Sequence, residues 1–171
     1  MESVRYLLNH PFIVLNNVAE VLYEQKTPAY YARLRSRAIG RHRFKEEEYK
    51  QLTKIFTQFG SKINKTADKL ELLTKDENPK KNILPVNLLH LPMLNVKQLL
   101  TKSAENTSLN YFRIYDSLRY RTKLSDTEIK AIINNLRLFV KDIELHLDLA
   151  KKEAKTYSFV LGRGSKSHIL A

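Results

Sequence analysis

The sequence predicts an all-α protein, a helical bundle of two similar helix-turn-helix-like units with a long C-terminal helix. Three observations lead to this prediction. The 171 residues include only four glycines and five prolines, so residues that interrupt helices are scarce. Apolar residues make up 43% of the chain, enough to bury a core, and they recur at helical spacing. Residues typical of helix caps stand at the ends of these periodic segments.

The N-terminal unit is predicted to cover residues 1–73. Its first apolar segment, residues 4–15, contains Pro11, which should kink the helix or split it in two. A short helix is expected over residues 17–24. Thr27 and Pro28 then mark the start of a basic helix, because Thr is a good N-cap and Pro suits the first helical position.

The basic helix should run to about Ala38 and end near Gly40, a residue suited to a left-handed C′ position. The next helix should begin near Lys45, where residues 46–48 are three glutamates that complement the helix dipole. It either breaks at Gly60 or continues to Leu73. Its apolar residues at helical spacing are Leu52, Ile55, Phe56, Phe59 and Ile63.

A connector with three prolines, residues 74–94, is expected to separate this unit from a second one, residues 95–156. The two units look like an internal duplication, because the segments that begin at Asn17 and Asn95 align. Further along, Phe44 and Glu48 match Leu124 and Glu128. Two unrelated amphipathic segments can also align this well when gaps are allowed, so chance similarity remains the alternative.

The second unit should end in a long helix. Residues 125–128 read as a capping box, in which Ser125 and Glu128 each bond the other's backbone N–H. The helix is predicted to continue to about Lys152, long enough to brace the whole protein or to form a dimer seam. Residues 157–171 are predicted to form a flexible or partner-ordered tail.

Charge is the strongest functional signal. Thirty basic residues against 18 acidic ones give a net charge of +12 and a pI near 9.8. Such an excess favours a polyanionic partner, most commonly nucleic acid; an anionic membrane or an acidic protein are the alternatives. The absence of cysteine excludes disulfides, thiolate zinc sites and a cysteine nucleophile. With no signal peptide and no apolar stretch of spanning length, we expect a soluble, cytoplasmic protein without a membrane partner.

The best candidate for a binding site is residues 26–45, which hold seven Lys or Arg and no Asp or Glu. On a helix, Tyr31, Leu34 and Ala38 would face the core, so the opposite face would be exposed. Arg there could read guanine or clamp a phosphate, and cations in the following loop could contact the backbone. A solvated surface or another anionic partner is the alternative. The predicted nucleic-acid-binding residues in this region are Tyr30, Arg33, Arg35, Ser36, Arg37, Arg41, Arg43 and Lys45.

The order of elements over about 50 residues resembles a helix-turn-helix unit in layout, with the basic helix in the place of the recognition helix. One departure is the turn at residues 23–26, which is longer than the tight glycine-containing turn of that motif. Tyr30 could stack on a base, although an aromatic residue near a helix start more often packs within the protein.

The second unit is predicted to have lost this basic face. Ile114 and Leu118 stand where the first unit has Arg33 and Arg37, which favours core packing. Three cations nearby are still predicted to touch phosphates: Arg119, Arg121 and Lys123.

Catalysis is not indicated. The five histidines are scattered, and the three consecutive glutamates fan around a helix start instead of converging, so no metal, cofactor or enzyme activity is expected. The sequence therefore predicts a DNA-binding protein, regulatory or architectural. A structural adaptor that forms a homo-oligomer through the long helix and binds an acidic protein is the first alternative, and an RNA-binding protein is the second.

Overall fold

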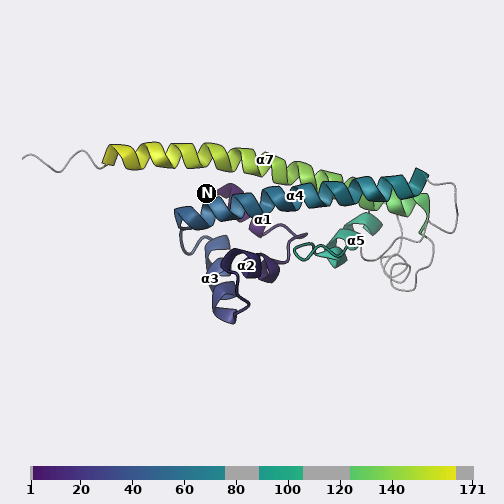
Figure 1. The fold of residues 1–171 in the computed structure, drawn as a ribbon, viewed down its shortest axis with the longest axis horizontal. Helices are drawn as coiled ribbons and strands as arrows, with labels where there is room; N and C mark the ends of the chain where they lie inside the picture. The colour runs from purple at the N-terminus through teal and green to yellow at the C-terminus, as the bar shows by residue number, and fades with distance from the viewer. Residues whose placement is uncertain (1, 76–88, 106–123, 165–171) are drawn as a thin grey trace, which may run out of the picture.

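The computed structural model describes residues 2–75, 89–105 and 124–164, and these form helices and no β-strand (Figure 1). The helices in chain order are α1 (Glu2–Leu8), α2 (Leu15–Tyr23), α3 (Pro28–Ala38), α4 (Glu46–Lys75), α5 (Val96–Glu105) and α7 (Asp126–Gly164). The all-α prediction is confirmed.

Two long helices, α4 and α7, run antiparallel and form the axis of the molecule (Figure 1). Their apolar residues recur three or four positions apart, so each helix buries one face against the other. Gly60 lies within α4 and does not end it; a Cβ there would sit 3.4 Å from Cγ2 of Ile143 on α7. The fully buried side chains along this seam include Leu52, Phe56, Ile63, Leu70, Ile132, Leu136 and Ala150.

The N-terminal helices pack on one side of this pair. The segment predicted at residues 4–15 is split: α1 ends at Leu8, and Pro11 lies in a turn before α2 begins. α1 contacts α7 and α3, while α2 contacts α3 and α4. This places α3 beside the N-terminal end of α4 (Figure 1).

The turns before α2 and α5 pair with each other. The N–H of Val14 donates to the carbonyl of Met93, and that of Asn95 donates to the carbonyl of Phe12, at 2.9 and 2.8 Å. An isolated antiparallel bridge joins Ile13 and Leu94. Because these two segments are far apart in the sequence, the bridge ties α5 to the N-terminal helices.

The helix starts predicted from the capping pattern are present in the structure. Ser125 donates its N–H to Glu128 Oε2 at 2.6 Å, and Glu128 donates its N–H to Ser125 Oγ at 3.3 Å. At α4, the N–H of Lys45 donates to Glu48 Oε2 at 3.0 Å. The matching of the two whole units also involves residues 106–123, outside the described part, so the duplication stays a prediction.

The last helix is longer than predicted. α7 continues past Lys152 to Gly164, so the first eight residues of the segment predicted as a tail are helical. The remaining part, residues 165–171, lies outside the described residues. Within the described residues, α7 therefore extends beyond the N-terminal end of α4 (Figure 1).

Candidate nucleic-acid interface

The loop that joins α3 to α4 is built on a glycine turn. Gly40 has φ +84° and donates its N–H to the carbonyl of Arg37, while the N–H of Arg41 reaches back to the carbonyl of Ser36 at 2.9 Å. This pair of bonds is a Schellman motif, and it requires a left-handed residue at the glycine position. The predicted helix end at Gly40 is confirmed.

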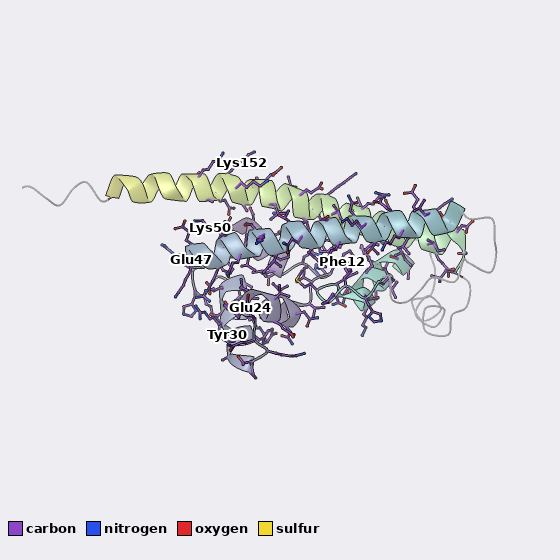
Figure 2. The ribbon with its side chains drawn as sticks, viewed as in Figure 1. Phe12, Glu24, Tyr30, Glu47, Lys50 and Lys152 are labelled. Atoms are coloured by element: carbon purple, nitrogen blue, oxygen red, sulfur yellow. The ribbon has the colours of Figure 1, made fainter. Side chains whose placement is uncertain are left out.

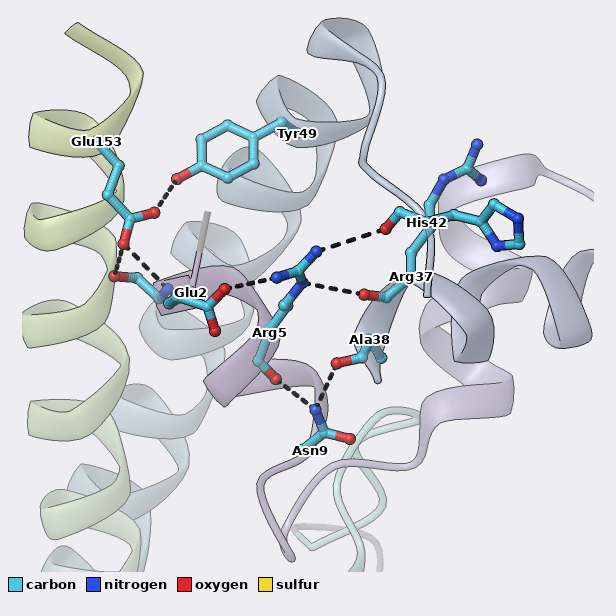
Figure 3. A network of polar contacts seen from close by, with 9 residues as sticks. Glu2, Arg5, Asn9, Arg37, Ala38, His42, Tyr49 and Glu153 are labelled. Carbon is cyan, nitrogen blue, oxygen red and sulfur yellow. Dashed lines mark hydrogen bonds and ion pairs between the residues drawn. The ribbon is translucent and has the colours of Figure 1, made fainter. Parts of the chain in front are cut away.

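Arg5 of α1 and Asn9, which directly follows α1, hold this loop by hydrogen bonds to its backbone (Figure 3). Arg5 Nε donates to the carbonyl of Arg37 at 3.2 Å, and its Nη2 donates to the carbonyl of His42 at 3.5 Å. Asn9 Nδ2 donates to the carbonyl of Ala38 at 2.9 Å. The carbonyls at the end of α3 are thus satisfied by side chains, which fixes the path of the loop.

The outer side of the loop is basic. His42 Nδ1 and Ser36 Oγ lie 2.5 Å apart, which ties the loop back onto α3. The cations around this tie are exposed, and none forms an ion pair with a described residue. They are Arg35, Arg41, Arg43 and Lys45. Three of these uncompensated positive charges lie on a loop of defined shape, and the fourth, Arg35, lies on the last turn of α3.

The prediction that Arg37 lies on the exposed face of the basic helix is wrong. Its side chain is 10% exposed, and its Nη1 lies 3.0 Å from Oε1 of Glu48. Arg37 also donates to the carbonyl of Arg43 at 3.0 Å and to the hydroxyl of Tyr23 at 3.1 Å. The physical reason is that α3 packs against α1 and α2, with Leu34 fully buried, and also contacts the first turn of α4 through Arg37.

Arg33 belongs to the same cluster and is half-buried. Its Nη2 lies 3.1 Å from Glu48 Oε1, and its guanidinium carbon lies 5.4 Å from the centre of the Tyr23 ring. Burial, followed by the Glu48 carboxylate, raises the pKa of the Tyr23 hydroxyl. The hydroxyl therefore stays protonated and donates to Glu48 at 3.1 Å.

Tyr30 packs within the protein. Its ring stacks on that of Tyr23, with centroids 4.8 Å apart and planes 20° apart. Figure 2 places Tyr30 on α3, on the side of the molecule away from α7. Stacking on Tyr23 leaves only part of the ring exposed, so the packing interpretation describes this residue better than base stacking.

The exposed face of α3 is therefore rotated about the helix axis relative to the predicted one. Arg35 is exposed on it, next to Ala29 and Ala32, while Leu34 and Ala38 are buried as predicted. The predicted contacts in the second unit, Arg119, Arg121 and Lys123, lie outside the described residues together with Ile114 and Leu118.

A row of exposed lysines on α4 was not predicted from the sequence, and none of them forms an ion pair with a described residue. A signal was present, because residues 49–67 contain no Asp or Glu. The row lies on the face of α4 opposite its buried residues and consists of Lys54, Lys62, Lys65 and Lys69.

Within the described residues, no three His, Asp or Glu side chains converge on a point where they could hold a metal ion. None of the helices in the described part of the chain combines the length and the apolar character needed to cross a bilayer. Comparison with family models, curated proteins and solved structures found no match to this chain.

Proposed function

We propose that this protein binds nucleic acid, with DNA preferred, through the exposed face of α3 and the basic loop between α3 and α4. The observation that carries the proposal is the set of four exposed cations, Arg35, Arg41, Arg43 and Lys45, without ion pairs to described residues. Several other exposed cations do pair, as Lys102 does with Glu105 and Lys151 with Asp148. A cluster left unpaired repels itself, and phosphates relieve that repulsion.

The chemistry of each part suits a duplex. Ala29 and Ala32 let the exposed face of α3 approach closely, and Arg35 has the planar fork that matches a guanine edge or a phosphate. Arg41 and Arg43 suit backbone phosphates, since they extend from a loop whose path is fixed by Arg5. The lysine row on α4 adds further positive charge for sequence-independent contacts.

Arg33 and Arg37 act as supporting residues and not as contacts to the nucleic acid. Their contacts with Glu48 hold α3 in place, so they support the contacting residues and do not themselves read bases. This revises the expectation from the sequence, in which both arginines faced the groove.

The test is a salt series of binding to a labelled random duplex, with wild type, Arg41→Gln/Arg43→Gln and a matched control. The control, Lys97→Gln/Lys130→Gln, removes the same charge from exposed positions on α5 and the start of α7, at the other end of the molecule (Figure 1). We expect wild-type affinity in the micromolar range, roughly 1–100 µM. The loop variant should flatten the log–log salt slope by about 2, one for each phosphate that the loop no longer neutralises.

Three outcomes would contradict the proposal or change the ligand. No binding at low salt removes nucleic acid as the partner and moves the search to acidic proteins. An equal loss in loop variant and control places the binding outside the loop. Preferential competition by an RNA hairpin or a single strand replaces the duplex by that ligand.

A further inference from the structure

An apolar stripe lies on the outer surface of α7. Leu138, Leu145 and Leu149 are 49%, 56% and 39% exposed, and their spacing of seven and four residues places them on one side of the helix. Tyr6 of α1, 46% exposed, borders the stripe, because its ring stacks on His146 at 3.8 Å. Large apolar side chains that share one face differ from singly exposed ones, which need no explanation.

A groove runs beside this stripe. It has a volume of about 730 Å³ and lies between α1, the end of α3 and α7. Tyr6, Ile39 and Leu149 supply its apolar lining, and Ile39 is 51% exposed. The stripe and the groove together offer an incoming helix apolar contacts on two sides.

The charge of α7 differs from that of the rest of the chain. α7 carries seven basic and six acidic residues, whereas the other residues carry 23 basic and 12 acidic ones. Two copies of a protein with a net charge of +12 repel each other over most of their surface. α7 is close to neutral, so two copies can approach through its surface at a lower electrostatic cost than through the basic loop or the lysine row of α4.

The stripe also has the spacing of a coiled-coil seam. Positions that alternate by four and three residues face a partner helix in such a seam. On α7 these positions are Leu138, Asp142, Leu145, Leu149 and Lys152. Figure 2 shows Lys152 at the surface of α7, and the Asp142 side chain is 45% exposed.

We propose that α7 pairs antiparallel with α7 of a second copy of this chain, with a two-fold axis beside residue 147. In this register Leu145 packs against Leu149 of the second copy, and Asp142 lies opposite Lys152 of the second copy. The two-fold repeats both contacts, so the interface holds two leucine layers and two opposite-charge layers. The charged layers select this register, because a shift would bury them against leucine.

This interface is independent of the proposed nucleic-acid binding, since the stripe shares no residue with the basic loop. A two-fold axis between the two α7 helices would nevertheless relate the two basic loops by symmetry, as in dimeric DNA-binding proteins that contact two half-sites.

The first test is sedimentation of the full chain from low to high micromolar concentration. Wild type should convert from monomer to dimer, and Leu145→Asp should stay monomeric. The matched control is Leu72→Asp, which places the same charge on an exposed leucine of α4, 66% exposed, and should dimerise as wild type does. Circular dichroism shows whether both variants fold. A wild type that stays monomeric, or a folded Leu145→Asp that dimerises normally, would overturn the proposal.

The second test addresses the register. Asp142→Lys and Lys152→Asp each place like charges opposite one another twice in the dimer, so each should weaken dimerisation about ten-fold or more. The double variant restores opposite charges and should recover most of the affinity, the signature of direct coupling. A double variant no better than the worse single one would exclude this register.

Discussion

Arg37 Nη1 and Glu48 Oε1 lie 3.0 Å apart in a contact between side chains that are only 10% and 8% exposed. This ion pair joins the last turn of α3 to the first turn of α4, and Arg33 adds a second cation to the same carboxylate. Removing two charges from water is costly unless their other polar atoms are also satisfied. Here the hydroxyl of Tyr23 donates to Glu48, and Nε of Arg37 donates to the carbonyl of Arg43. The position of α3 relative to α4 therefore depends on one carboxylate.

Neutralising this carboxylate should destabilise the protein strongly. Glu48→Gln keeps the shape and leaves an amide oxygen for the N–H of Lys45, but Arg37 would stay buried without a counter-charge. We expect a loss of about 3 kcal/mol in the free energy of unfolding, because breaking a buried pair costs this order of energy. Urea denaturation of both proteins measures it.

The control for this change is Glu46→Gln, two residues earlier on the same helix. Glu46 pairs with Lys50 at 2.6 Å, but both side chains are more than two-thirds exposed. Surface pairs of this kind contribute little, so the midpoint of unfolding should not move measurably. Equal effects from both variants would show that Glu48 is not a buried partner.

Substituting Arg37 should lower the stability of the protein, whereas substituting Arg43 should lower its affinity for a duplex. Arg37→Ala leaves Glu48 buried with one cation fewer and should lower the free energy of unfolding by about 3 kcal/mol. Arg43→Ala removes an exposed side chain whose carbonyl, not its guanidinium, contacts Arg37, so stability should stay unchanged. Duplex affinity at low salt should fall in Arg43→Ala. A destabilised Arg43→Ala with normal affinity would reverse these roles.

Much of the fold could be predicted because its signals are local. The Thr27 cap, the Gly40 turn and the Ser125–Glu128 box depend on contacts within a few residues, and all three are present. The apolar spacing of α4 likewise gave its buried face, with Leu52 and Phe56 fully buried. Such features follow from residue type and spacing alone.

The orientation of α3 could not be predicted, because it depends on tertiary contacts. A helix periodicity identifies one apolar face, and Leu34 and Ala38 mark it correctly. Arg37 is buried on a second side, where it contacts Glu48. From the sequence alone, a glutamate in the first turn of a helix is explained equally well by its interaction with the helix dipole. Only the packing of α4 against α3 distinguishes these two roles. The same holds for Arg5 and Asn9, whose sequence positions do not indicate that they support the basic loop.

Gly40 and Gly60 should respond to alanine in opposite directions. Gly40 has φ +84°, where a Cβ is strained whatever the space around it, so Gly40→Ala should cost about 1–2 kcal/mol. Gly60 is helical, and a Cβ there would make an ordinary contact with Ile143 at 3.4 Å. Because alanine favours helix over glycine, Gly60→Ala should stabilise by about 0.5–1 kcal/mol. Thermal unfolding of both variants compares them; a destabilised Gly60→Ala would mean that α4 and α7 need a bare backbone at this crossing.

The free energy of unfolding should decrease as the pH falls, because His10 is held neutral in the folded protein. Its ring stacks on Phe139 at 4.3 Å, its Nδ1 accepts the N–H of Phe12 at 3.1 Å, and its Nε2 lies 3.8 Å from Asp142. Burial lowers the pKa of His10, Asp142 opposes this shift, and His146 adds to it.

Between the ordinary histidine pKa near 6.5 and the lower pKa in the folded protein, the unfolded chain binds more protons than the folded one. The contribution of His10 is therefore complete above about pH 6.5 and is lost as the pH falls through this window, with a slope of at most about 1.4 kcal/mol per pH unit. His10→Gln, which cannot titrate, should show a weaker decline than wild type when urea denaturation is measured at a series of pH values from about 7.5 down to about 5. Identical declines in the two proteins would mean that His10 is not held neutral by its surroundings.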